Sequence, residues 1–247
     1  MLSYGEKLKE KERLRALPLL ETPMTVRLKF RKIGSLQYIS HLDLQRTFNR
    51  VIVRACIPVW YTKGFNPHAK LVFSTPLSVG SQSVYEFLDI RIDREMPPAE
   101  IMARLNRELT DELCITEAYF PENDFSAIAW ASYDFEICTK DASPALAEAM
   151  QTTLTTSPLI LTKRTKSGEK DVDIVPMIRE VTVTWNEEEK RIAIRAVLRA
   201  ASAEFLNPEL VITGLKQKHG ILAGNPTEEW YSIMRTAVMR ENGELFR

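Results

Sequence analysis

Residues 38–70 read YISHLDLQRTFNRVIVRACIPVWYTKGFNPHAK, and the first half of the chain is organised around this stretch. Ser40 precedes an apolar run and Asp43 follows three positions later, a pairing typical of a helix N-terminus. Apolar residues then recur at helical spacing; they are Leu44, Phe48, Val51, Ile52 and Ala55. The pattern predicts a helix that begins after Ser40 and ends before Pro58.

The opposite face of this helix is basic. Arg46, Arg50 and Arg54 are spaced four apart and therefore form one ridge. Beyond the helix, the sequence from Gly64 to His68 predicts a turn. Cations and an aromatic ring share that turn, namely Lys63, Phe65, His68 and Lys70. An arginine ridge is equally compatible with an ordinary solvated helix face.

Strand-like segments surround the helix. Residues 25–31 alternate between apolar and basic side chains, and the basic set is Arg27, Lys29 and Arg31. Residues 83–93 alternate as well, with Tyr85 and Phe87 on the face opposite Leu88 and Ile90. Short strands near 59–61 and 70–73, a helix over 97–109 and a strand over 114–120 complete the order β-α-β-β-α-β. This order is the ferredoxin-like, or split β-α-β, arrangement.

The second half predicts a less regular unit of the same kind. Strands are expected over 132–139 and 158–163, a hairpin over 181–199 and a strand over 232–241. Helices are expected over 143–153 and after Asn207, the latter ending near His219 with Gly220 as its cap. Between them, residues 163–170 predict a polar, basic loop. The predicted fold class is therefore α+β, with two ferredoxin-like units, antiparallel sheets and helices on one face. The expected parts are a charged leader (1–23), a first domain (24–122) and a second domain (130–247).

Charge is distributed unevenly along the chain. Residues 1–80 carry 14 Lys and Arg against 5 Asp and Glu, a net of +9, and the remainder carries 19 against 28, a net of −9. Such a separation favours a basic surface that meets a polyanion or an acidic partner, or an attraction between the two halves.

Several classes of protein are disfavoured by what the sequence lacks. Its 3 cysteines are widely spaced, without the clustering of a zinc or iron–sulfur site. No glycine-rich phosphate loop and no common hydrolase or kinase motif occurs. No apolar run approaches the length of a membrane span. We therefore expect a cytoplasmic protein with no cofactor, no metal site and no membrane partner.

The string YISHLDLQR, followed by GFNPHAKLVFSTPLSVGSQSVYEFLDI, resembles the radical SAM-linked protein family, bacterial proteins of unassigned function. The resemblance covers about residues 24–230. The chain lacks a C-x-x-x-C-x-x-C motif, so it matches the stand-alone form of that family. The resemblance implies a radical SAM enzyme as partner, and it assigns no catalytic residue. More distantly, two ferredoxin-like units with an early histidine are similar to CRISPR repeat-processing endoribonucleases, whose glycine-rich C-terminal loop has no counterpart here.

Three functions follow as hypotheses. The first is a non-catalytic RNA-binding module that acts with a radical SAM enzyme in tRNA or rRNA modification, because cations beside aromatic rings on an open sheet are typical of single-stranded RNA binders. Its expected contact residues are Arg27, Lys29, Arg31, Arg46, Arg50, Arg54, Lys63, Phe65, His68, Lys70, Tyr85 and Phe87. The second is a metal-independent endoribonuclease that uses His41 as general base; the favoured alternative is that His41 is a first-turn residue that packs on the sheet. The third is a protein-docking adaptor that binds no nucleic acid.

Overall fold

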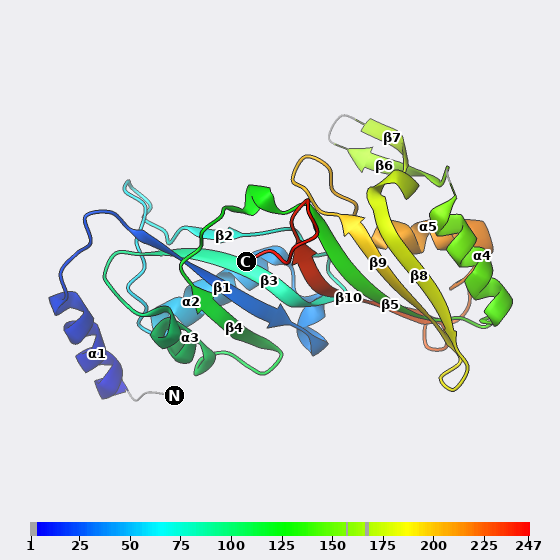
Figure 1. Cartoon of the computed structure of the whole chain (residues 1–247). Coiled ribbons are helices and arrows are strands. Elements are labelled where there is room, and N and C mark those ends of the chain that lie inside the picture. Colours follow the sequence, from blue (N-terminus) through cyan, green and yellow to red (C-terminus); the bar gives the residue numbers. More distant parts are fainter. Residues whose placement is uncertain (1–3, 157, 166–167) are drawn as a thin grey trace. The chain divides into compact units, whose positions relative to one another are not determined.

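The computed structural model describes residues 4–156, 158–165 and 168–247 (Figure 1). The chain is a mixed α+β protein with antiparallel strand pairing within each of its two compact units. The first unit comprises residues 1–125 with Arg247, and the second comprises residues 126–246. The sequence had placed the break between residues 122 and 130.

The first unit contains three helices and four strands among the described residues. In chain order they are α1 (Tyr4–Ala16), β1 (Met24–Lys32), α2 (His41–Arg54), β2 (Leu71–Phe73), β3 (Ser81–Ile92), α3 (Pro98–Asn106) and β4 (Leu113–Tyr119). The strands lie in the order β4-β1-β3-β2. β1 and β3 therefore occupy the middle of the sheet, as the sequence pattern predicted.

The core of the first unit lies between this sheet and its helices. The apolar face of β1 is fully buried and packs with the apolar stripe of α2; the rings of Phe30 and Phe48 lie 5.1 Å apart, edge to face. Ile101 and Leu105 of α3 join the same cluster. The α2 N-terminus forms as expected, because Ser40 accepts a hydrogen bond from the Asp43 backbone N–H at 3.1 Å.

The charged leader is a packed helix. Leu14 of α1 is buried in the core of the first unit. Glu10 forms an ion pair with Arg104 of α3 at 2.5 Å, and Arg13 reaches Glu100 at 3.4 Å. Some of the alternating charges of α1 thus form ion pairs with α3. The composition of the segment alone did not indicate these contacts.

The second unit contains two helices and six strands among the described residues. They are β5 (Trp130–Cys138), α4 (Pro144–Thr155), β6 (Ile160–Thr165), β7 (Gly168–Asp173), β8 (Ile178–Asn186), β9 (Arg191–Arg199), α5 (Glu209–His219) and β10 (Trp230–Met239). Four of the strands lie in the order β10-β5-β9-β8, and β6 pairs with β7 as a separate hairpin. The prediction of a basic loop over 163–170 was therefore wrong for residues 163–165, which end β6, and for residues 168–170, which begin β7. Lys166 and Ser167 lie outside the described residues.

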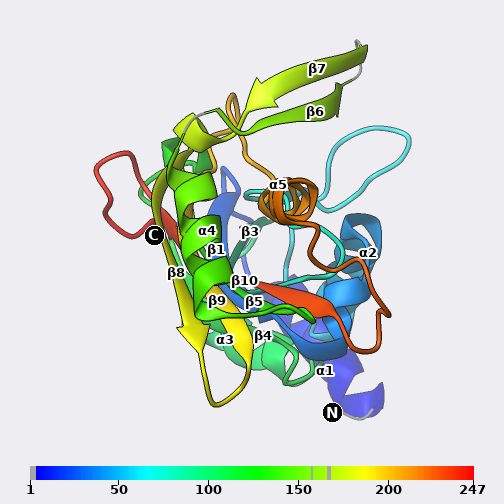
Figure 2. The same cartoon turned by 90° about the vertical axis from the view of Figure 1, so that its right-hand side faces the viewer.

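Both helices of the second unit lie on one side of its sheet (Figure 2). The buried face of β9 carries Ile192, Ile194 and Leu198, whereas its arginines lie on the other face, as predicted. α5 ends at Gly220 in the left-handed conformation, with φ of 65°, which glycine adopts without steric cost. Within the described residues, none of the helices combines the length and the apolar character needed to cross a bilayer.

The strands β4 and β8 each lie at one end of these orders. The outer backbone groups of each strand bind a side-chain amide from a helix. In the first unit, the Asn106 carboxamide donates to the Ile115 carbonyl and accepts from the Ile115 N–H of β4, both at 2.8 Å. In the second unit, the Gln151 carboxamide donates to the Val181 carbonyl at 3.2 Å and accepts from the Val183 N–H of β8 at 2.7 Å. Each helix amide thus takes the place of a neighbouring strand.

Candidate nucleic-acid interface

The basic face expected on β1 is not open at Arg27. This side chain is 0% exposed, and its guanidinium forms two hydrogen bonds of 2.8 Å with the two carboxylate oxygens of Asp89. The same guanidinium lies 4.3 Å from the centre of the Phe125 ring. Arg27 is thus a buried, paired cation, which leaves no surface for an RNA in this structure.

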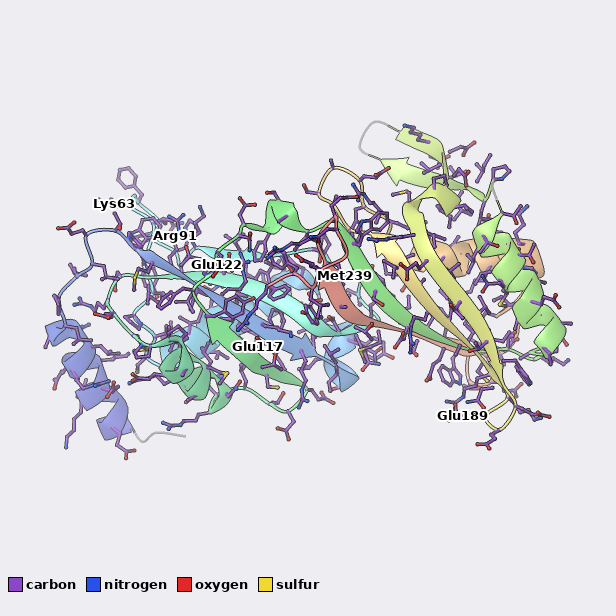
Figure 3. The ribbon with its side chains drawn as sticks, viewed as in Figure 1. Lys63, Arg91, Glu117, Glu122, Glu189 and Met239 are labelled. Atoms are coloured by element: carbon purple, nitrogen blue, oxygen red, sulfur yellow. The ribbon has the colours of Figure 1, made fainter. Side chains whose placement is uncertain are left out.

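The neighbouring cations of β1 are also engaged. Lys29 binds the Glu117 carboxylate at 2.8 Å and lies 3.9 Å above the Tyr85 ring. Arg31 donates to the Asp111 carbonyl at 2.8 Å. Figure 3 labels Glu117 on β4, beside the strand that carries these cations. The charges of Arg27 and Lys29 are therefore balanced by carboxylates of neighbouring strands, whereas Arg31 is bound to a backbone carbonyl.

The aromatic residues expected on this face are covered to different degrees. Phe87 is only 1% exposed and lies in contact distance of Tyr85 and Phe125, with ring centres 5.5 and 6.5 Å away. Tyr85 stays half-buried under Lys29. The expected open platform of Tyr85 and Phe87 is therefore corrected: Phe87 belongs to an aromatic cluster that Phe125 helps to cover.

The arginine ridge of α2 lies on the solvent side, as the spacing predicted. Arg46 pairs with Asp43 at 3.1 Å, and Arg54 pairs with Glu108 at 3.1 Å. Arg50 between them is exposed, and none of the described carboxylates pairs with it. Of the ridge, Arg50 thus offers the least compensated positive charge.

The segment that follows α2 forms a closed loop, which we call the 62–70 loop. Tyr61 bridges to Ala69 at its base. The Thr62 N–H donates to the His68 carbonyl at 3.0 Å, and the His68 N–H donates to the Thr62 hydroxyl at 3.1 Å. The Nδ1 atom of His68 lies 3.1 Å from both the Thr62 hydroxyl and the Asn66 carbonyl. His68 therefore braces the loop from within.

The outer side of the 62–70 loop carries the groups that a ligand could reach. Phe65 is fully exposed, and Lys63 and Lys70 are exposed as well. Among the residues that the structure describes, no carboxylate pairs with either lysine. Figure 3 shows Lys63 on this loop, which projects beyond the sheet of its unit. Leaving a phenylalanine in water forgoes roughly 1.5–3 kcal/mol of burial free energy, so such a ring on a braced loop is typical of a contact residue.

His41 occupies the first position of α2 and is exposed. Its ring packs edge to face on Phe73 of β2, with the ring centres 5.0 Å apart. A general base is normally oriented by an acceptor on its second nitrogen, and within the described part of the chain His41 has no such partner. The same described ranges hold no group of three or more metal-ligating side chains. Among the described residues, the endoribonuclease hypothesis, which requires no metal, thus has no second group that would orient His41.

The sequence reasoning missed a groove at the foot of the 62–70 loop. Its volume is about 320 Å³, and it lies among the end of α1, the end of α2 and the segment that leads into the loop. Tyr61 and Val53 form part of its rim, and Lys11 and Arg15 of α1 contribute its cations. The spacing of Lys11 and Arg15, four positions apart on one side of a helix, is the signal that could have indicated it.

The solved structures that resemble this chain are only weakly similar to it. Solved structures that match most of the chain include two of a Rhodococcus protein. One is a variant of Rhodococcus jostii RHA1 DypB in complex with heme, at 10% identity and a TM-score of 0.22, covering 90% of this chain and 93% of that chain. The other is a second crystal form of DyPB from the same organism, at 10% identity and a TM-score of 0.19, covering 90% and 92%. Values this low carry no argument about fold or function.

The family comparison is more informative. No curated protein matches the sequence. The family model described as "Uncharacterized protein conserved in bacteria (DUF2344)" matches residues 25–208. That range includes β1 except Met24, the arginine ridge of α2 and the whole 62–70 loop, and it excludes α1. Because the match spans about three quarters of the sequence, the chain belongs to this family of uncharacterized proteins conserved in bacteria.

Proposed function

We propose that this protein is a non-catalytic RNA-binding module whose main contact is the 62–70 loop. The observation that carries the proposal is the exposed Phe65 ring between Lys63 and Lys70 on a loop braced by Thr62 and His68. An exposed ring offers a stacking surface for a base, and flanking cations attract the phosphates on either side.

The proposed surface extends from the loop to the solvent side of α2. Arg50 lies on that side without a described carboxylate partner, and Arg54 is about half exposed although it pairs with Glu108. Single-stranded RNA fits these features better than a duplex does, because bases must be unstacked before a side-chain ring can reach their faces. The β1 cations are left out of the contact set because Arg27 and Lys29 are paired with carboxylates and Arg31 is bound to a backbone carbonyl.

We further propose that the module serves a radical SAM enzyme in tRNA or rRNA modification. This partner rests on the resemblance of YISHLDLQR and GFNPHAKLVFSTPLSVGSQSVYEFLDI to the radical SAM-linked proteins. The second of these strings begins within the 62–70 loop, so we expect the radical SAM-linked proteins to share this loop. Presentation of an RNA to a separate enzyme requires binding residues and no catalytic group of its own.

We also propose that each unit is a ferredoxin-like, split β-α-β unit. In support, the strand orders β4-β1-β3-β2 and β10-β5-β9-β8 each place the first and third of their own four strands, counted in chain order, in the middle. A helix follows the first strand of each of these orders, and another follows the third: α2 and α3 in the first unit, α4 and α5 in the second. Small domains of this arrangement serve many functions, so the fold alone does not carry the RNA proposal.

Replacing Arg50, Lys63 and Lys70 together by alanine should flatten the salt dependence of RNA binding. Each phosphate contact to a single strand contributes about 0.7 to the slope of log K against log salt, so the triple variant should lose about 2 from the magnitude of that slope. The measurement is fluorescence anisotropy with a labelled single-stranded RNA over a series of salt concentrations. Arg46→Ala is the matched control, because Arg46 lies on the same ridge but is already paired with Asp43; it should change the slope less than Arg50→Ala does. A triple variant with the wild-type slope would contradict the proposed surface.

Ultraviolet crosslinking in native cells should recover RNA attached to peptides of the 62–70 loop. Sequencing the RNA and identifying proteins that copurify would test both parts of the proposal at once. We expect a discrete set of tRNA or rRNA fragments and a radical SAM enzyme. Recovery of protein partners with no crosslinked RNA would instead favour the docking-adaptor hypothesis.

A further inference from the structure

The groove at the foot of the 62–70 loop has an apolar floor. Cys56, Ile57 and Val59 line it and are buried. Its rim is apolar but open, because Val53 is 50% exposed and Tyr61 is 45% exposed. A volume of about 320 Å³ lies within the range of roughly 300–1,000 Å³ that is typical of small-ligand pockets. The floor and rim therefore suit one flat, largely apolar group such as a nucleobase.

The charged groups that line the groove are mostly cations. Lys11 and Arg15 project from α1, and in the described part of the chain neither side chain has an ion-pair partner. Arg94 is also part of the lining, and it donates to the carbonyls of Arg15 and Leu17, which ties the end of α1 to the groove wall. This excess of positive charge favours a ligand that carries phosphate.

Asp93 contributes the carboxylate of the groove. Burial raises its pKa, and the nearby Arg94 at 3.8 Å opposes that effect. Its backbone groups are used in the fold, since its N–H donates to the Pro58 carbonyl at 2.9 Å. A carboxylate in this position can accept a hydrogen bond from an exocyclic amino group, which cytosine has and uracil lacks.

The groove is continuous with the proposed RNA surface through two residues. Tyr61 lines the groove and also pairs with Ala69 to close the base of the 62–70 loop. Val53 lines the groove and lies three positions after Arg50, hence on the same side of α2. A strand bound at the loop and at Arg50 would therefore pass the groove.

We propose that this groove holds one nucleotide of the RNA strand bound by the 62–70 loop, an inference that rests on the proposed function. The base lies on the apolar floor beside Tyr61, its exocyclic amine donates to Asp93, and its phosphate is held by Lys11 and Arg15. α1 is then part of the binding site, and cytosine is preferred over uracil at this position.

The test compares anisotropy titrations of two labelled RNAs, a cytidine 12-mer and a uridine 12-mer, on the full chain. We expect tighter binding of the cytidine probe by the wild type. Lys11→Ala and Arg15→Ala should each weaken binding severalfold, and the two together should lower the salt slope by about 0.7, the value of the one phosphate contact that they share. Lys9→Ala is the matched control, since Lys9 is an exposed lysine of α1 that does not line this groove. Alanine raises helix propensity at all three positions, so loss of α1 would not explain a difference.

The outcomes separate this inference from the proposed function. If the wild type binds neither probe, the RNA-binding function itself fails. If Phe65→Ala weakens binding while Lys11→Ala and Arg15→Ala match Lys9→Ala, the groove plays no part and the inference is overturned, but the loop function stands. If the α1 variants weaken binding and the two probes bind equally, the assignment of base selection to Asp93 is overturned.

Discussion

Replacing Asp89 by alanine should destabilise the first unit by about 3–5 kcal/mol, the usual cost of leaving a buried ion without its partner. Arg27 is 0% exposed, and its guanidinium donates two hydrogen bonds of 2.8 Å to Asp89, so the carboxylate compensates a charge that water cannot reach. Equilibrium urea unfolding, followed by circular dichroism and analysed at constant slope, measures the loss directly.

The chain offers a matched control on the adjacent strand pair. Glu117→Ala removes the carboxylate partner of Lys29, also at 2.8 Å, but this pair is more exposed, with side-chain exposures of 17% and 40%. Its removal should cost at most about 1 kcal/mol. Replacing Arg27 by methionine and Asp89 by leucine together should recover most of the stability, because no lone charge remains. Equal losses for Asp89→Ala and Glu117→Ala would show that burial of the Arg27 charge is not what makes the pair important.

The largest effect on binding is expected from Phe65→Ala, which should weaken binding of single-stranded RNA by about 5- to 150-fold. This range corresponds to roughly 1–3 kcal/mol for the stacking of one base on an aromatic ring. The substitution should leave the unfolding midpoint unchanged, because Phe65 is fully exposed and the loop is closed by Thr62 and His68. Anisotropy titration with a labelled 12-mer, alongside a urea titration of the same variant, gives both readouts.

Two further substitutions at this position distinguish stacking from simple apolar contact. Phe65→Tyr keeps a ring and should bind RNA nearly as well as the wild type. Phe65→Leu keeps an apolar side chain but loses the ring, so it should resemble Phe65→Ala. If every variant lacked RNA binding, and Phe65→Leu still supported the protein's role in the cell as well as the wild type does, the loop would instead be a docking element for a protein.

Local structure could be predicted well from the sequence because its signals are local. Ser40 begins α2, Gly220 ends α5, and the alternation of Val26, Leu28 and Phe30 selects the buried face of β1. The α+β class follows from the order of such elements. None of these assignments requires knowledge of which residues meet across the sheet.

The candidate site was predicted less well, because the charge that a side chain presents depends on its neighbours across strands. Arg27 and Lys29 look like a basic stripe along one strand, but they lie directly opposite Asp89 and Glu117 in the register. An acidic residue in each neighbouring strand was visible in the sequence, yet only the register fixes which cation it meets. Phe125 lies far along the chain from Phe87, so its cover of that ring could not be read from either segment. The 62–70 loop could be predicted from the sequence because the contacts that brace it join residues that are close in sequence.

The amides of Asn106 and Gln151 bear on how any partner can be recruited. Edge strands with free backbone groups invite strand addition, in which a peptide or a second chain continues the sheet. At Ile115 of β4 and at Val181 and Val183 of β8, those groups are already satisfied by the chain's own helices. Recruitment by backbone pairing is therefore closed at these positions, and a partner there must be selected by side chains, which can discriminate between ligands where a bare strand edge cannot.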